Sequence, residues 1–431
     1  MSFSPVRKLE VWRTFTDGQQ RLLGHLAQNR QGVYFQYDSD YLSHGANLSP
    51  FHLNWDAGLQ LAPSTPHRGL HGAFADSLPD GWGTLLMDRA FRQHGILPAQ
   101  ISAMDRLAFV GGRGMGALAY RPCSAYANDA ETEDALDLHT LGLQAQSVFD
   151  GLTEEVMAAL LAVGSSGGAR PKAQLYFAGG EFRHCRAVPA AGDEAWLVKF
   201  TSSSLALGHE EGLCEAAYLQ LAERAGLVVP NWRLLPAPAA SGASHWLALQ
   251  RFDWVASDGP NHGRRHMHSA CGLLDADHRI PSLDYEDLIK ASSLLCRSPA
   301  AGQVQFRRAM FNLLAVNQDD HSKNWAFLLD DAGHWSLAPF FDVTFSPNHH
   351  GEHATAFAGY GQSPPLKVVQ RLASVANFAS WSDARAVIRE VLDSLSCFDA
   401  VAANIGVKPG TRALIEKRLS ATWKANRHLL D

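Results

Sequence analysis

A segment dense in polar side chains, residues 317–324 (NQDDHSKN), lies between two apolar segments of the chain. A predicted helix over residues 306–316 precedes it, and an apolar run over residues 325–329 follows it. So many polar side chains at the junction of two buried elements are unusual for a plain surface loop. Catalytic and binding residues often lie on loops that a rigid scaffold positions in this way. The pattern therefore predicts a catalytic loop, and a solvated turn with helix-capping Asp and Asn is the alternative.

The residue types of this segment match the chemistry of phosphoryl transfer. In that reaction an Asp accepts the proton of the attacking hydroxyl, and an Asn a few residues downstream holds a metal ion. A further acid, Asp342, follows two aromatic residues in the segment 337–343 (LAPFFDV), after a strand predicted over 334–337. An Asp in this place can bind Mg²⁺ that bridges nucleotide phosphates. A turn-capping Asp is the alternative.

A glycine-rich segment, residues 163–172 (VGSSGGARPK), is predicted between a helix over 154–161 and a strand over 172–177. Glycines let backbone N–H groups approach an anion closely, and the segment ends in a lysine. It is not a Walker A loop, since GxxxxGK[ST] is absent. The segment is either a phosphate-binding loop or an ordinary flexible turn.

A lysine stands in an apolar predicted strand, residues 196–200 (WLVKF). The charge of Lys199 is directed either to a nucleotide phosphate or along the side chain to solvent. Glu215 follows in an amphipathic helix predicted over 208–225. A helix glutamate paired with a strand lysine positions phosphates in kinases; the alternative is that Glu215 faces water.

The order of predicted elements indicates an α+β protein with a small accessory unit on a bilobal domain. Its three parts are residues 1–123, which are rich in strands, 124–254, which contain the glycine-rich loop, and 255–431, which are mainly helical. The predicted elements are strands over 9–15, 21–28, 33–38 and 245–252, helices over 83–94, 285–296 and 303–314, further helix after 383, a polar linker over 124–137, and an exposed His-rich loop over 257–268.

Composition excludes several classes of protein. A hydrophobic content of 46% argues against disorder, and a net charge of −6 argues against a protein that holds DNA by bulk charge. The six cysteines show no CxxC spacing, so neither a zinc knuckle nor a redox dithiol is indicated, and buried thiols in a reducing cytosol are expected. The N-terminus lacks the apolar region of a signal peptide, and no apolar run approaches the length of a membrane span. We expect a cytoplasmic protein without a membrane partner.

Three histidines, His349, His350 and His353, raise the alternative of a metal site. No HExxH motif accompanies them, and the neighbouring Pro347-Asn348 indicates a loop. We therefore expect these side chains to be exposed loop histidines.

Taken together, these segments resemble the HipA family of bacterial toxin kinases. The motifs GGARPK, WLVKF, LAERAGLVVP, LQRFDW, NQDDHSKN and LAPFFDV stand in that family's order, and FADSLPDGWG resembles its N-terminal subdomain. The resemblance implies a two-lobed, protein-kinase-like fold that phosphorylates serine or threonine with ATP and Mg²⁺. It also implies a helix-turn-helix antitoxin as partner, with DNA contacted only through that complex, and a protein substrate such as an aminoacyl-tRNA synthetase.

The resemblance also implies a role for each matching position. Many members have a shorter SxxGAQxK-like loop where this chain reads GSSGGARPK, and Gln250 replaces an acid common in the family. The implied residues are Asp319 as catalytic base, with His321 and Lys323 beside it; Asn324 and Asp342 as Mg²⁺ ligands; Ser166, Gly167, Gly168, Lys172, Lys199, Glu215, Gln250, Phe252 and Asp253 around ATP; and Ser165 or Ser166 as the site of autophosphorylation.

Two other classes of function remain alternatives. A small-molecule kinase is one, because kinase-like folds also phosphorylate sugars, antibiotics and lipids. A non-catalytic corepressor in a toxin–antitoxin complex is the other. The basic segment 408–428 could contact DNA in such a complex, although a solvated helix face is its expected role.

Overall fold

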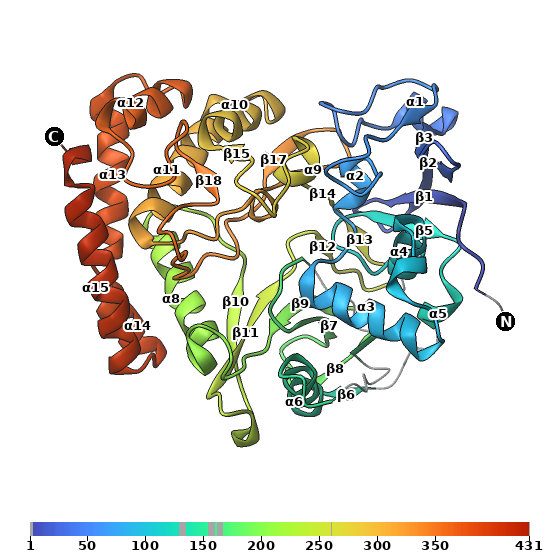
Figure 1. The fold of residues 1–431 in the computed structure, drawn as a ribbon, viewed down its shortest axis with the longest axis horizontal. Helices are drawn as coiled ribbons and strands as arrows, with labels where there is room; N and C mark the ends of the chain where they lie inside the picture. Colours follow the sequence, from blue (N-terminus) through green and yellow to red (C-terminus); the bar gives the residue numbers. More distant parts are fainter. Residues whose placement is uncertain (1–2, 129–134, 154–159, 162–166, 260, 431) are drawn as a thin grey trace.

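The computed structural model describes residues 3–128, 135–153, 160–161, 167–259 and 261–430. Most of the sheet structure lies in the N-terminal part of the chain and most of the helices in the C-terminal part (Figure 1). The α+β fold class is thereby confirmed. The predicted helix over 154–161 and both candidate phosphorylation sites, Ser165 and Ser166, lie outside the described residues, apart from positions 160 and 161.

The N-terminal unit is built on an antiparallel sheet with strand order β4-β3-β2-β1-β5. Alternating apolar residues of these strands pack with helix α4 into one core, as the period-2 pattern of the sequence requires. The predicted strands are confirmed. The elements are β1 (Lys8–Thr14), β2 (Gln20–Gln28), β3 (Val33–Tyr37), β4 (Gln60–Leu61), β5 (Leu118–Arg121), α1 (Ser39–His44), α2 (Gly72–Ala75), α3 (Gly81–Gln93), α4 (Ala103–Val110) and α5 (Ala125–Asn128).

The middle of the chain forms an antiparallel sheet with strand order β10-β11-β9-β7. Helix α6 packs against it so closely that a Cβ on Gly142 would stand 2.2 Å from the Trp246 ring. Helix α8 covers the sheet toward the C-terminal lobe, and its Gly212 lies against Leu247. The elements are α6 (Leu138–Phe149), β7 (Lys172–Phe177), β9 (Glu194–Lys199), α8 (Glu211–Arg224), β10 (Trp232–Pro236) and β11 (His245–Gln250).

The C-terminal lobe is a helical body with one small sheet, β14-β16-β17. Its core is the largest of the protein and is continuous with α8. The predicted helices are confirmed. The elements are β14 (His266–Ser269), α9 (Ala270–Leu273), α10 (Tyr285–Leu295), α11 (Pro299–Ala315), β16 (Ala326–Leu329), β17 (Trp335–Leu337), α12 (Leu366–Val375), α13 (Trp381–Leu395), α14 (Phe398–Ile405) and α15 (Pro409–Ala425).

The N-terminal unit is packed directly onto the C-terminal lobe. Helices α2 and α9 meet at two glycines, where a Cβ on Gly72 would stand 1.9 Å from the carbonyl oxygen of Gly272. Beside this contact, the Asp76 carboxylate accepts hydrogen bonds from the Ser269 amide (2.7 Å) and the Ser269 hydroxyl (2.6 Å), and it lies 2.6 Å from the His268 ring. The accessory unit is therefore an integral part of the body around the cleft.

Several predictions about polar segments are wrong. The segment 257–268 is not an exposed loop: it contains β13 (Gly263–Arg264) and most of β14, and His262, His266 and His268 are buried. The reason is tertiary, since β14 lies between β16 and the N-terminal unit, so a polar strand is covered on both sides. His353 is also buried, because it binds Asp320.

Two smaller predictions need correction as well. The linker expected over 124–137 contains ordered elements at its ends, α5 and β6 (Leu136–Asp137), and β6 pairs with β8 (His184–Cys185); residues 129–134 lie outside the described part. Cys123 is exposed rather than buried, because it follows the end of the edge strand β5. Among the described residues, no helix is long and apolar enough to span a membrane.

The close contact between α2 and α9 leads to a prediction about stability. Gly72→Ala should lower the free energy of unfolding by about 1–3 kcal/mol, because the new methyl group forces the two helices apart. Thermal or urea unfolding measures the change. Gly179→Ala is the matched control, since nothing lies within 4 Å of its added Cβ; an equal effect of both substitutions would contradict the packing argument.

Candidate functional site

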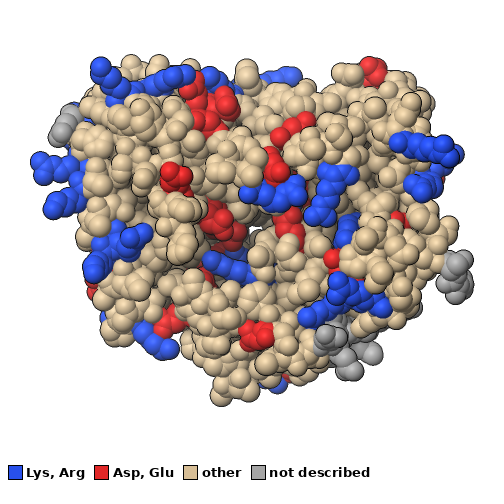
Figure 2. Space-filling view, viewed as in Figure 1, with Lys and Arg blue, Asp and Glu red and all other residues tan. Residues whose placement is uncertain are grey.

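A cleft of about 990 Å³, counting its open mouth, lies between the β7–β9–β11 sheet and the segment 317–324. In the space-filling view, acidic and basic side chains gather around a hollow near the centre of the face (Figure 2). The cleft brings together ten predicted site residues from distant parts of the sequence: Gly167, Gly168, Lys172, Lys199, Gln250, Phe252, His321, Lys323, Asn324 and Asp342. Asp319, Glu215 and Asp253 do not line it.

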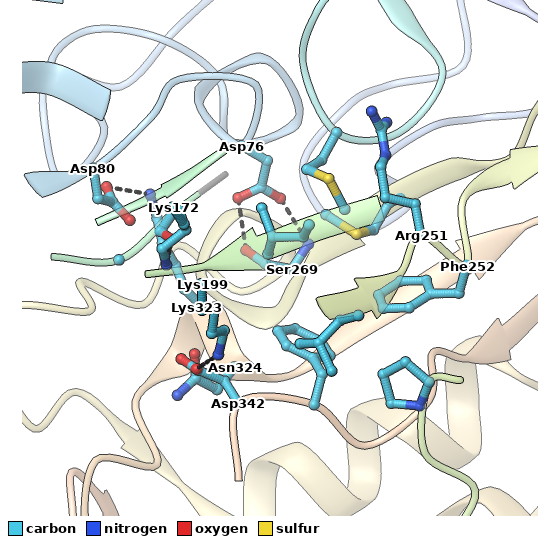
Figure 3. Close-up of a pocket in the computed structure, with 18 of the residues that line it drawn as sticks. Asp76, Asp80, Lys172, Lys199, Arg251, Phe252, Ser269, Lys323, Asn324 and Asp342 are labelled. Carbon is cyan, nitrogen blue, oxygen red and sulfur yellow. Dashed lines mark hydrogen bonds and ion pairs between the residues drawn. The ribbon is translucent and has the colours of Figure 1, made fainter. Parts of the chain in front are cut away.

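A buried ion cluster stands at the base of the cleft. Lys199, at the end of β9, donates to both carboxylate oxygens of Glu215 on α8 (2.7 and 2.8 Å). It also donates to Asp342 Oδ1 at 2.6 Å, a contact drawn in Figure 3. The predicted pairing of the strand lysine with the helix glutamate is therefore present, and the third partner comes from the C-terminal lobe.

Lys199 and Asp342 stabilise each other's charge, whereas burial raises the pKa of Glu215 despite its contact with Lys199. Burial acts to lower the pKa of Lys199, but Asp342 and Glu215 outweigh burial and raise it, so the ammonium is retained. Burial acts to raise the pKa of Asp342, but Lys199, Lys172 and Arg170 outweigh it and hold that pKa far below its usual range. Asp342 also has a left-handed backbone (φ 55°), a conformation that Asp and Asn adopt more often than most other residues.

The two adjacent acids of the catalytic segment have opposite environments. Asp320 is fully buried and accepts hydrogen bonds from the Tyr285 hydroxyl (2.6 Å) and the Thr355 amide (3.1 Å), and His353 Nδ1 lies 2.8 Å from its carboxylate. The Asp319 side chain is 64% exposed, and its Oδ1 lies 3.9 Å from Nε2 of His321, which lines the cleft. Asp320 therefore anchors the loop, and Asp319 is the acid that is open to solvent.

Backbone contacts hold Asp319 in place. Helix α11 ends at Val316 in a left-handed conformation (φ 56°). The Ser346 hydroxyl then donates to Asn317 Oδ1 (2.8 Å) and accepts from the Asp319 amide (3.2 Å). Asn324 Nδ2 donates to the Asp319 carbonyl at 2.8 Å.

The surroundings of Asp319 raise the pKa of its carboxyl group. The protein around the cleft mouth raises the pKa of Asp319 by desolvation; His321, with Nε2 3.9 Å from Asp319 Oδ1, opposes the rise, and Asp342 adds to it. A base whose pKa lies nearer neutrality accepts a proton more readily.

The described end of the glycine-rich segment lies beside the cations of the cleft. Gly168 has φ +99°, and Lys172 Nζ donates to the Gly167 carbonyl at 2.5 Å. Burial lowers the pKa of Lys172 to about 8. Arg170 is paired with Glu211 at 3.0 Å and was not singled out in the sequence, because nothing there shows that it faces Asp342 and Asp319.

The hinge, residues 250–253 (QRFD), contributes apolar lining and one structural acid. Gln250 and Phe252 line the cleft. Asp253 does not, because its fully buried carboxylate is bound by Arg251 (2.6 and 3.0 Å) and by the Gly116 amide (2.6 Å). Asp253 therefore ties the hinge to the N-terminal unit. The apolar lining of the cleft is suited to a flat aromatic ligand and comprises Leu78, Met115, Leu197, Pro230, Leu249, Phe252, Met267 and Phe341.

Five polar or charged residues missing from the sequence prediction also line the cleft: Asp76, Ser77, Asp80, Arg251 and Ser269. Asp80 Oδ1 lies 2.6 Å from Lys323 Nζ, and Figure 3 draws this pair together with the Asp76–Ser269 contacts. The motif FADSLPDGWG contains both acids, but only the docking of the N-terminal unit shows that they reach the cleft.

The donor set suits a metal held jointly with a ligand. Asn324 and Asp342 both line the cleft, and Asn324 Nδ2 is used by the Asp319 carbonyl, so its oxygen is the atom left for a cation. Mg²⁺ is commonly bound by one or two carboxylate or amide oxygens plus phosphate oxygens and water. Within the described ranges, no group of three or more His, Cys, Asp or Glu residues could hold a metal alone.

The two lobes and the charged cleft between them define a kinase-like α+β fold. The profile of the HipA-like C-terminal domain matches residues 164–397, and that of the HipA N-terminal domain matches residues 17–121. The chain therefore belongs to the HipA family of toxins.

Two relatives show how far the similarity extends. "Putative kinase Y4mE" of Sinorhizobium fredii is 26% identical over 359 residues, which are 78% of this chain and 77% of that protein. The HipA structure from the Shewanella oneidensis toxin–antitoxin complex with HipB and operator DNA has 18% identity and a TM-score of 0.65, and the match covers 98% of this chain and 96% of that one. At this identity the structural match supports the fold.

The contrast between Asp319 and Asp320 leads to a prediction about stability. Asp320→Ala should lower the free energy of unfolding by about 3–5 kcal/mol, because it leaves buried polar partners unpaired. Asp319→Ala should change it by no more than about 0.5 kcal/mol, because its contacts are made by the backbone. Urea unfolding of both variants decides the matter, and equal losses would refute the assignment of the two roles.

Proposed function

We propose that this protein is an ATP- and Mg²⁺-dependent serine/threonine protein kinase that acts as a HipA-like toxin. The observation that carries the proposal is the Lys199–Glu215–Asp342 cluster in one cleft with the exposed base Asp319 at its mouth. Membership of the HipA family and the name of the Sinorhizobium relative support kinase chemistry.

The lining of the cleft fits ATP from one end to the other. Apolar side chains from β9, β11 and the hinge would enclose adenine, with Gln250 and Phe252 at its edge. Lys199, Lys172 and the backbone of Gly167 and Gly168 would hold the phosphates. Asn324 and Asp342 would hold Mg²⁺, which would supply positive charge to the bridging phosphate oxygens.

The side chains of the chain perform the remaining steps. Asp319 orients the hydroxyl of the acceptor serine or threonine and accepts its proton. The hydroxyl oxygen forms a bond to the γ-phosphorus while the bond from that phosphorus to the β–γ bridging oxygen breaks, and ADP leaves. Lys323 and Lys199 balance the negative charge that develops on the transferred group.

The proposal includes partners and self-modification. The Shewanella structure contains HipB and operator DNA, which supports an antitoxin partner of helix-turn-helix type here and DNA contact through that complex. The protein substrate, an aminoacyl-tRNA synthetase in the family comparison, and a cytoplasmic location remain proposals. Autophosphorylation at Ser165 or Ser166 is supported by the sequence alone.

Two alternatives are less well supported. A small-molecule kinase does not account for an N-terminal unit that lines the cleft with Asp76 and Asp80. A non-catalytic corepressor does not account for Lys199, Asp319, Asn324 and Asp342 all standing in position. Phosphate transfer to small alcohols and to no protein would favour the first alternative.

Transfer of phosphate from ATP is the direct test. Asp319→Ala should lower the rate by about 10²–10⁴-fold, because the reaction loses its base. Asp342→Ala should lower it at least as far, because it removes a metal ligand and leaves Lys199 with one partner. The measurement is incorporation of labelled γ-phosphate into lysate protein in the presence of Mg²⁺, with a phosphoproteome comparison of cells that express wild type or Asp319→Ala. Wild-type rates in either variant would overturn the assignment.

The lowered pKa of Lys172 predicts how ATP affinity depends on pH. Without ATP, Lys172 is mostly protonated below about pH 8 and mostly neutral above it. Bound phosphates favour the protonated form. ATP affinity should therefore be steady below about pH 7.5 and fall by up to about tenfold per unit above pH 8. Calorimetric titration with Mg²⁺-ATP measures it, and Lys172→Arg should flatten the curve because a guanidinium stays charged. The same slope in both proteins would contradict the prediction.

A further inference from the structure

We infer that Asp80, from the N-terminal unit, is a positioning residue for Lys323 of the catalytic segment and so couples that unit to phosphate transfer. Asp80 Oδ1 lies 2.6 Å from Lys323 Nζ, although the two residues are far apart in the sequence. This inference rests on the proposed function, and it extends that function to a residue outside both kinase lobes.

Asp80 stands where three parts of the protein meet. Its Oδ2 lies so close to the glycine-rich segment that a Cβ on Gly167 would stand 2.9 Å from it. Its Oδ1 lies 3.6 Å from His278 Nε2, and the ring of His278 lies 5.9 Å from that of His321. The Asp80 carboxylate therefore lies beside Gly167 of the glycine-rich segment, Lys323 of the segment 317–324 and His278 of the C-terminal lobe.

The backbone around Asp80 is fixed to the kinase lobe. The Trp82 amide donates to the Gly168 carbonyl (3.2 Å), and the Trp82 indole donates to the Lys172 carbonyl (2.8 Å). Gly81 packs against Ala169 so closely that a Cβ there would stand 2.7 Å from its Cα. The start of α3 is thus fixed to the described end of the glycine-rich segment.

The Asp80 carboxylate is committed to Lys323 rather than to its own helix. Asp80 occupies the N-cap position of α3, where an Asp side chain usually accepts a backbone hydrogen bond, but it makes no such bond. Burial acts to raise the pKa of Asp80, but Lys323 outweighs burial and lowers it. The carboxylate is therefore charged at neutral pH.

This arrangement leaves Lys323 able to serve the reaction. A lysine ammonium has three N–H donors, and Asp80 takes one of them. Among the described residues, Lys323 Nζ donates a hydrogen bond only to Asp80, so two donors remain. Because Lys323 and Asp342 line the same cleft, these donors can serve the γ-phosphate. Without Asp80, the flexible side chain of Lys323 would not hold its ammonium group in one position. Even a small misplacement of a group that contacts the reacting atoms lowers the rate strongly.

The test uses the full chain and one substitution that keeps the shape of the side chain. Asp80→Asn should lower the maximal rate of phosphate transfer into lysate protein by about tenfold, with the KM for ATP changed by less than about threefold. Asp88→Asn is the matched control on the same helix: Asp88 is 22% exposed and ion-paired to Arg106 at 2.7 Å, whereas Asp80 is 19% exposed and paired at 2.6 Å. This control should retain the wild-type rate.

A double-mutant cycle separates positioning from general support of the fold. If Asp80 acts through Lys323, Asp80→Asn should cost little further activity in a Lys323→Met background. An equal loss in both backgrounds, or a wild-type rate in Asp80→Asn alone, would overturn the inference and leave the kinase proposal standing. Absence of transfer by the wild-type protein would instead overturn the proposed function, and the inference with it.

Discussion

The arrangement of the two lobes depends on the ion pairs that the buried ammonium of Lys199 makes with Glu215 and Asp342. It ends strand β9, binds Glu215 on α8 at 2.7 and 2.8 Å, and binds Asp342 of the C-terminal lobe at 2.6 Å. Lys199 and Glu215 are buried, and Asp342 is partly exposed. Burying a charge is costly unless it is paired, so removing one member leaves its partner uncompensated. The cluster therefore fixes the sheet, the helix and the C-terminal lobe at one point, and the cleft opens beside it.

A second set of charges joins the N-terminal unit to the same cleft. Asp76 is bound by Ser269 and His268, Asp253 by Arg251 and the Gly116 amide, and Asp80 by Lys323. Except for Asp253–Arg251, these contacts link segments that are distant in the chain. The unit that appears accessory in the sequence thus forms part of the cleft wall, which gives the HipA N-terminal domain a physical role beside the kinase-like lobes.

Much of the candidate site could be predicted because its chemistry is local in sequence. The segment 317–324 is polar between two buried elements, and Lys199 is a charge in an apolar strand; both patterns are visible without the fold. The polar segment 257–268 could not be interpreted in the same way, because a strand covered on both sides by other parts of the protein can be polar. The same reason explains His353, which is buried because Asp320 needs a partner.

The sequence by itself determined the order of the elements and the types of reactive group, since strand and helix periodicity and the charge of a side chain are local properties. It also predicted Asp319, Asn324, Asp342 and Lys199 as the candidate site residues. Only the tertiary structure decided which of two neighbouring acids is exposed, because burial depends on what packs around a loop: Asp320 is enclosed by Tyr285, His353 and Thr355, and Asp319 is not. It likewise decided that Asp80 reaches Lys323, since that contact exists only after the N-terminal unit has docked.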